Sequence, residues 1–121
     1  MTIAQVSKKY SLTHDTLRYY ERAGLIPAVP RKNGIRDYDE ESCRWIEFVK
    51  CMRLAGIPIE VINDYVALVG QGDSTAQARL NLLVNQRKVL QAKLADMQQT
   101  LQRLDTKISY YTDLQQSQSD K

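Results

Sequence analysis

The sequence has no long hydrophobic run. Across its 121 residues, no apolar segment approaches the ~20 residues that a helix needs to cross a bilayer. No signal peptide is recognisable at the beginning of the sequence. We therefore expect a cytoplasmic protein without a membrane partner.

Cysteine and histidine are also scarce. The chain has two cysteines, Cys43 and Cys51, and a single histidine, His14. Two cysteines eight residues apart, without a histidine cluster, argue against a disulfide scaffold and against a zinc site. No carboxylate pair and no nucleophile–base set is positioned by a recognisable motif. We therefore expect no metal, no cofactor and no enzymatic activity.

Positive charge is concentrated in the first third of the chain. Residues 1–38 contain seven Lys or Arg against three Asp or Glu, whereas residues 57–75 contain three acidic residues and no Lys or Arg. A basic segment at one end of a weakly basic protein is typical of a surface that meets nucleic-acid phosphates.

Two short helices are predicted within this basic segment. Thr2 begins the first, over residues 2–9, because Thr2 and Gln5 have capping-box spacing. Thr13 is an N-cap candidate for the second, and Gly24 can end it in a left-handed conformation. Taken alone, this second helix fits a DNA groove and a solvent-exposed helix equally well. Together, the two helices predict a helix-turn-helix.

The dipeptide Asn33-Gly34 predicts a tight β-hairpin, because both residues tolerate the left-handed backbone of a two-residue turn. Arg31-Lys32 precedes it and Ile35-Arg36 follows it. An ordinary surface turn is one interpretation. The basic residues on both arms favour a wing that contacts DNA phosphates.

Two further helices are expected before the pattern changes. Asp39 caps the first, which runs to about Ala55 and is ended by Gly56. Pro58 starts the second at its first position, and Gly70 ends it.

The remaining sequence predicts a coiled coil. Apolar side chains recur at alternating spacings of three and four residues, which makes a stripe too narrow for a globular core. The predicted dimerisation residues are Leu83, Leu90, Leu94, Met97, Leu101, Leu104 and Ile108. A helix of ~40 residues extends roughly 60 Å, so its stripe needs a partner, most simply a second copy of the chain.

These elements define the predicted architecture. The fold class is all-α with a small β-hairpin wing. We expect a winged helix-turn-helix domain over residues 1–70, a coiled-coil dimerisation helix over residues 73–113 and a fraying polar tail over residues 114–121.

With these elements in place, the chain resembles the MerR family of bacterial transcription regulators over essentially its whole length. The motifs that carry the resemblance are Thr16–Glu21, Gly24–Pro27 and Arg36–Tyr38. The resemblance implies an antiparallel homodimer that binds a palindromic promoter operator in double-stranded DNA. An effector would then make the dimer distort the spacer DNA, so that RNA polymerase engages both promoter elements.

The family pattern also implies site residues. Glu21 either contacts DNA or pairs with Arg18 or Arg22 and orients them, and Tyr20 is expected in the core. The predicted DNA-contacting residues are Thr13, His14, Arg18, Tyr19, Lys32, Arg36 and Tyr38.

Cys51 has two interpretations. Metal-sensing relatives carry cysteines around the dimer helix, whereas this sequence has none after Cys51. Multidrug-sensing relatives carry an added C-terminal ligand domain, which we do not expect in this chain. We therefore expect neither a metal nor a large drug as the effector. Cys51 resembles the lone cysteine in the third helix of the aldehyde- and thiol-stress-responsive branch, where a thiolate would attack electrophiles. The alternative is an inert core residue, which is how we interpret Cys43.

The alternatives to a transcription regulator are an architectural or recombination accessory protein without an effector, and a coiled-coil interaction protein without a nucleic-acid role. Only the regulator would respond to an effector at a promoter, and a protein without a nucleic-acid role would bind DNA weakly and without salt dependence.

Overall fold

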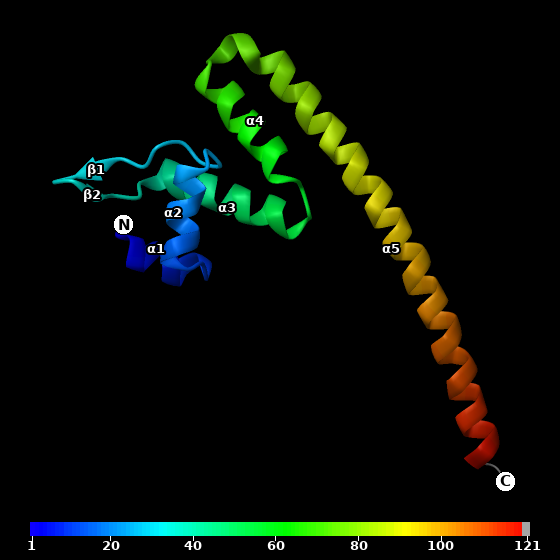
Figure 1. Cartoon of the computed structure of the whole chain (residues 1–121). Helices are drawn as coiled ribbons and strands as arrows, with labels where there is room; N and C mark the ends of the chain where they lie inside the picture. Colours follow the sequence, from blue (N-terminus) through cyan, green and yellow to red (C-terminus); the bar gives the residue numbers. More distant parts are fainter. Residues whose placement is uncertain (120–121) are drawn as a thin grey trace. The chain divides into compact units, whose positions relative to one another are not determined.

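The computed structural model describes residues 1–119 and divides the chain into two compact units, Met1–Leu83 and Val84–Lys121. The end of the predicted polar tail, residues 120–121, lies outside the described residues. The element order agrees with the predicted fold class, which is mainly helical with one small hairpin (Figure 1). Within residues 1–119, no helix is both long enough and apolar enough to span a membrane.

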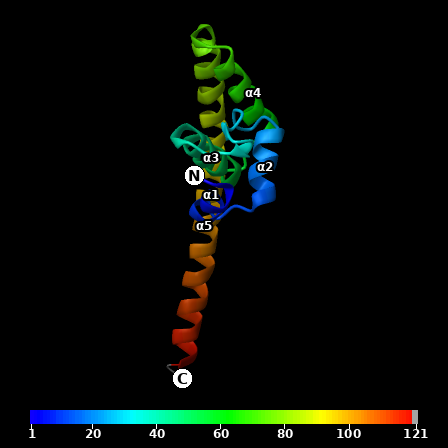
Figure 2. The same ribbon diagram turned by 90° about the vertical axis from the view of Figure 1, so that its left-hand side faces the viewer.

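The first two helices are α1 (Ile3–Tyr10) and α2 (His14–Arg22), and Figure 2 shows the short link between them from the side. The predicted capping box of α1 is confirmed: the Thr2 hydroxyl accepts from the Gln5 amide, and the Gln5 side chain accepts from the Thr2 amide. The Thr13 hydroxyl caps α2 by accepting from the Thr16 amide at 3.0 Å.

Gly24 follows α2 with a φ of 71° and packs closely against the fourth helix. Asn63 donates to the carbonyl oxygens of Ala23 and Gly24, at 2.9 and 3.2 Å. A Cβ on residue 24 would lie 2.7 Å from the Asn63 amide nitrogen. The left-handed backbone therefore favours glycine here, and a Cβ would displace the Asn63 amide from these two carbonyl oxygens.

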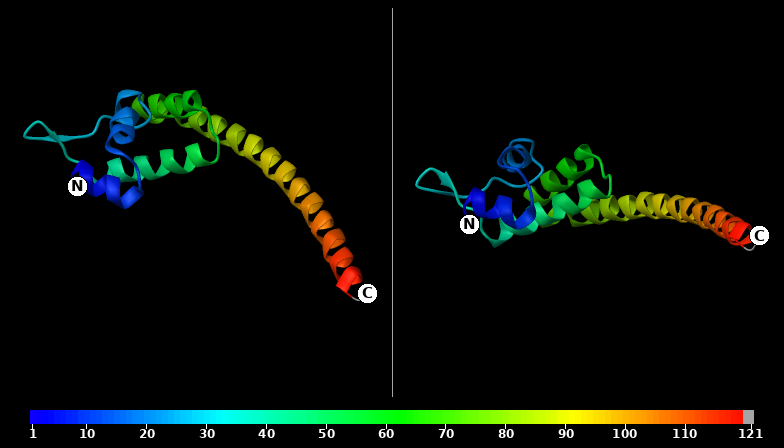
Figure 3. Two further views of the ribbon diagram at one scale, coloured as in Figure 1. Left: turned by 60° about the horizontal axis from the view of Figure 1, so that its bottom comes forward. Right: turned by 90° about the horizontal axis from the view of Figure 1, so that it is seen from below.

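The wing is a two-stranded antiparallel hairpin of β1 (Arg31–Lys32) and β2 (Ile35–Arg36). It extends away from the helices of the first unit in both views of Figure 3. Asn33 and Gly34 have φ values of 53° and 78°, which confirms the predicted two-residue turn.

The helices α3 (Glu40–Leu54) and α4 (Ile59–Gly70) complete the hydrophobic core of the first unit. Asp39 caps α3 as predicted, whereas Pro58 is the N-cap of α4 and not its first helical residue. The buried apolar residues are Val6, Leu17, Tyr20, Leu25, Ile26, Val29, Tyr38, Cys43, Ile46, Val49, Ile57 and Ile62.

A short 3₁₀ helix, Asp73–Thr75, leads into the long helix α5 (Ala76–Ser119). Figure 3 shows α5 as a continuous, gently curved helix. It includes residues 114–119, the part of the predicted polar tail that the structure describes. The side chains of residues 114–119 are mainly Gln and Ser, which are polar but compatible with a helix.

The side chains of the predicted coiled-coil stripe are exposed in the single chain. Their exposed fractions range from 39% for Leu83 to 69% for Met97. Repeated exposure of large apolar side chains along one helix is costly in water.

Candidate nucleic-acid interface

The helix α2 presents polar and aromatic side chains on one face because its other face is anchored in the core. Leu17 is completely buried and Tyr20 is 6% exposed, as expected for Tyr20. His14, Arg18 and Tyr19 are exposed on the helix that these two residues hold.

Two contacts within α2 organise this exposed face. The Arg18 guanidinium lies 3.3 Å from the Asp15 carboxylate, and both side chains are well exposed. Such a pair stabilises by at most about 1 kcal/mol, so Arg18 can exchange Asp15 for another anion. The Arg22 guanidinium lies 5.8 Å from the centre of the Tyr19 ring, in a cation–π contact.

The wing adds a second group of cations. Lys32 is exposed next to the turn, and Arg31 faces Arg36 directly across the hairpin. Asp37, just after β2, is the nearest acidic residue in sequence.

Glu21 connects the wing to α2. Its carboxylate accepts from the Val29 amide at 2.6 Å and from the Arg36 Nε at 2.8 Å, and it pairs with Arg31 at 3.4 Å. Burial alone would raise the pKa of this carboxylate. The hydrogen bonds from Arg36 and Val29 and the positive charges of Arg31 and Arg36 outweigh it, so the pKa of Glu21 lies below its ordinary value.

This geometry corrects the prediction for Glu21. The expected partner was Arg18 or Arg22, both on the same helix, but the structure pairs Glu21 with the two arginines of the wing. These partners reach Glu21 because the chain returns to α2 through the hairpin. Arg36, predicted to contact DNA, is accordingly engaged with Glu21.

Tyr38 is also corrected. It was predicted to contact DNA, but its side chain is 1% exposed and belongs to the hydrophobic core. Its hydroxyl has no hydrogen-bond partner within residues 1–119, and burial raises its pKa. A ring enclosed on all sides cannot reach a DNA groove, so the Arg36–Tyr38 motif has a structural role at its last residue.

Arg31 was part of the predicted wing, but neither its ion pair with Glu21 nor its position opposite Arg36 was predicted. The pairing of Arg31 with Arg36 could have been predicted from the sequence. A two-residue turn at Asn33-Gly34 fixes the register of the hairpin and places these two residues opposite each other.

The two cysteines differ in environment. Cys43 is buried, as expected for a structural residue, whereas Cys51 is an exposed thiol on α3. The interpretation of Cys51 as a buried core residue is therefore wrong for the single chain. The two adjacent cations contact backbone oxygens: Lys50 donates to the Tyr10 carbonyl, and Arg53 donates to the Ile57 carbonyl at 3.4 Å.

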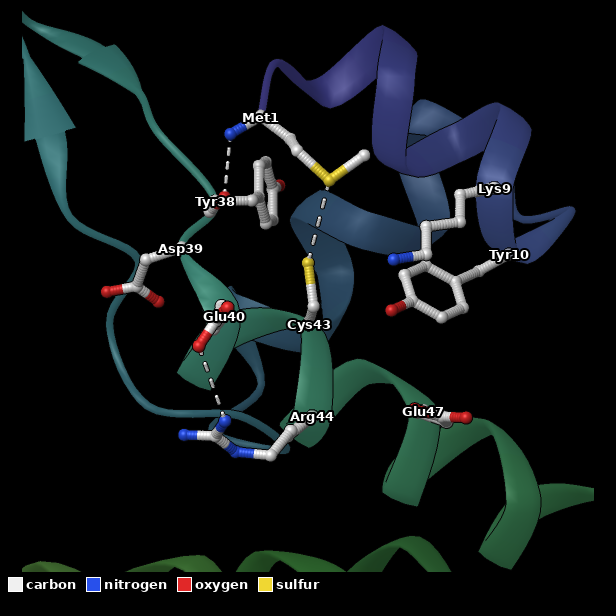
Figure 4. Close-up of a pocket in the computed structure, with 9 residues that line it drawn as sticks. All are labelled: Met1, Lys9, Tyr10, Tyr38, Asp39, Glu40, Cys43, Arg44 and Glu47. Atoms are coloured by element: carbon white, nitrogen blue, oxygen red, sulfur yellow. Dashed lines mark hydrogen bonds and ion pairs between the residues drawn. The ribbon is translucent and has the colours of Figure 1, made fainter.

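An open depression of about 550 Å³ lies beside α1 and the beginning of α3 (Figure 4). Its lining includes Cys43, whose sulfur lies 4.0 Å from the Met1 sulfur, and the ion pair of Glu40 with Arg44 at 3.9 Å. No group of three His, Cys, Asp or Glu side chains within residues 1–119 is arranged to hold a metal ion. The depression is therefore not part of the candidate interface, which consists of the basic face of α2 and the wing.

Comparison with known proteins agrees with a nucleic-acid interface on α2 and the wing. Residues 1–68 match the MerR HTH family regulatory protein family, and residues 43–107 match the family described as MerR, DNA binding. The HTH-type transcriptional regulator AdhR of Bacillus subtilis is 58% identical over 91 residues, which cover 74% of this chain and 65% of AdhR. The aligned part thus spans slightly less than two thirds of that relative's length.

Two solved structures share the fold. A putative MerR family transcriptional regulator from Listeria monocytogenes has a TM-score of 0.89 and 45% identity, covering 92% of this chain and 85% of the other. HiNmlR, a MerR family regulator lacking the sensor domain and bound to promoter DNA, has a TM-score of 0.85 and 28% identity, covering 93% and 90%.

Proposed function

Because the chain belongs to the MerR HTH family of regulatory proteins, we propose that it binds promoter DNA as a homodimer and controls transcription in response to an effector. The observation that carries this proposal is the exposed basic and aromatic face formed by α2 and the wing, in a fold shared with a regulator solved on promoter DNA. This role is regulatory and not catalytic, and it places the protein in the bacterial cytoplasm, where promoter DNA lies.

The exposed side chains divide the work of DNA recognition. Arg18 and Tyr19 reach base edges from α2, where a guanidinium pairs with guanine and an aromatic ring adds apolar contact. Thr13, His14 and Lys32 contact the sugar–phosphate backbone and fix the orientation of the domain.

Dimerisation uses the exposed apolar stripe of α5. Residues 73–113 supply this stripe, and residues 1–70 supply the DNA-binding domain. A second copy of the chain is the simplest partner that carries a matching stripe of the same length. The dimer places two DNA-binding domains on the two halves of a palindromic operator.

The dimer acts through the shape of the DNA. Such an operator lies between the two promoter elements that RNA polymerase recognises, and bending and untwisting the spacer brings them into register. Specificity then includes base pairs that the protein deforms without touching.

Cys51 is the proposed sensor. Its exposure on α3 leaves the thiol accessible to small electrophiles. With formaldehyde, the thiolate adds to the carbonyl carbon and the oxygen takes up a proton, which gives a hemithioacetal.

In vitro transcription from the chain's own promoter tests this function. A gel shift first establishes that wild type, Cys51→Ser and the control Cys43→Ala bind the promoter. Formaldehyde should then activate transcription with wild type and Cys43→Ala but not with Cys51→Ser. Equal responses of all three proteins would contradict the sensor role. The absence of any response would favour an architectural protein, and the absence of binding would contradict the proposed function.

A further inference from the structure

The wing places two positive charges directly opposite each other. Arg31 and Arg36 are paired residues of the antiparallel hairpin β1–β2. Like charges at directly opposed positions destabilise a two-stranded pair, and this hairpin is only two residues long on each side. An anion shared by the two guanidinium groups relieves the repulsion.

Glu21 is that anion, but it serves the two arginines unequally. Its carboxylate is 3.4 Å from the Arg31 Nη2, which is longer than a good hydrogen bond, and 2.8 Å from the Arg36 Nε. The Arg36 side chain is 29% exposed and the Arg31 side chain is 43% exposed. The carboxylate also accepts from the Val29 amide, so its two oxygens already have strong donors without Arg31.

The charges of this cluster do not balance either. One carboxylate faces two guanidinium groups, which leaves one net positive charge on the cluster of Glu21, Arg31 and Arg36. Lys32 adds a further positive charge on the same wing. The surplus belongs to Arg31, which has the longer contact and the greater exposure. A second anion that approaches from solvent meets Arg31 before it meets Arg36.

We propose that Arg31 binds an operator phosphate. In the free protein, Glu21 holds the Arg31 side chain in position for this contact. Arg36 is a positioning residue, and it stays paired with Glu21 when DNA is bound. This inference rests on the proposed function. It adds Arg31 to Lys32 as a phosphate contact of the wing and removes Arg36 from the predicted contacts. The phosphate supplies the second negative charge, while the Arg36–Glu21–Val29 contacts keep the hairpin attached to α2.

Salt dependence separates the two roles, because each phosphate contact releases counterions and a positioning residue does not. The probe is a fluorescent duplex from the upstream region of the chain's own gene, and binding is followed by anisotropy over a series of KCl concentrations. The variants are Arg31→Gln and Arg36→Gln. Arg44→Gln is the matched control, because it removes the same charge from an exposed site on α3.

For Arg31→Gln, the slope of log affinity against log salt should become shallower by about 0.9 per protomer, or about 1.8 per dimer. Doubling the salt should therefore weaken this variant about 3.5-fold less than wild type. Arg36→Gln should bind more weakly at every salt concentration with the slope of the control. Hydrogen exchange of the Val29 amide should be faster in Arg36→Gln and unchanged in Arg31→Gln.

Two results would overturn the inference. One is a slope for Arg31→Gln equal to that of Arg44→Gln, and the other is a slope for Arg36→Gln reduced as much as that of Arg31→Gln. If Arg36→Gln does not fold, Arg36→Lys replaces it. The salt dependence of Arg36→Lys should have the slope of Arg44→Gln, and a shallower slope would again contradict the inference. A wild-type protein that binds the duplex without salt dependence would instead contradict the proposed function.

Discussion

Replacing Glu21 with Gln should weaken the attachment of the wing to α2 and lower the free energy of unfolding. A carboxylate offers two acceptor oxygens, whereas a carboxamide offers only one and adds donors. Either the Val29 amide or the Arg36 Nε therefore loses its acceptor, and the acceptor of the remaining bond is neutral. The contact to Arg31 adds little, because it is 3.4 Å long and that side chain is 43% exposed.

The expected loss is about 2–3 kcal/mol, since a hydrogen bond to a charged group contributes about 1.5–3 kcal/mol and water replaces part of the bond at Arg36. Chemical denaturation at one fixed protein concentration measures it, because the stability of a dimer depends on concentration. Glu47→Gln is the matched control, as Glu47 lies exposed on α3. Its substitution should change the free energy of unfolding by less than about 0.5 kcal/mol.

The effect should also depend on pH. The pKa of Glu21 is lowered in the folded protein, so its ionised form stabilises the fold fully above the unfolded value of about 4.3. This stabilisation is lost as the pH falls through the lower folded value. The difference between wild type and Glu21→Gln should thus be constant near neutral pH and shrink below about pH 4. A difference that keeps its full size in strong acid would refute the role of the carboxylate charge.

Three further substitutions test other parts of the structure. Arg18→Ala should weaken binding to the promoter duplex by about 1–3 kcal/mol in a gel shift, and unchanged affinity would remove Arg18 from the interface. The double substitution Leu101→Asp and Leu104→Asp should give monomers in light scattering, because it places charge in the dimer seam, and a persistent dimer would show that the seam lies elsewhere. Tyr38→Phe should leave DNA affinity unchanged and raise the free energy of unfolding by about 1 kcal/mol, because the buried hydroxyl has no partner among the described residues. Weaker DNA binding by a fully folded Tyr38→Phe would restore Tyr38 as a contact residue.

Features that depend on neighbours in sequence could be predicted. The capping box at Thr2 and the N-caps at Thr13 and Asp39 depend on side-chain hydrogen bonds to residues three positions away. The turn at Asn33-Gly34 depends on the backbone preferences of two adjacent residues. The burial of Leu17 likewise follows from helical periodicity.

The partners of polar groups could not be predicted in the same way. Glu21 pairs with residues ten and fifteen positions away because the chain returns to α2 through the hairpin. Tyr38 is buried by the packing of several elements, which a motif of three residues does not describe. The exposure of Cys51 is also a property of the folded helix, since free cysteine in general favours the core.

A footprint of the protein on the upstream region of its own gene tests the central claim most directly. Two winged domains related by twofold symmetry should protect two symmetric half-sites between the promoter elements, with distorted base pairs at the centre. Arg18→Ala should lose this protection at concentrations where wild type is saturated. The absence of protection by a folded, dimeric wild-type protein, or protection of a single half-site without symmetry, would contradict the claim that this chain regulates transcription as a DNA-bound dimer.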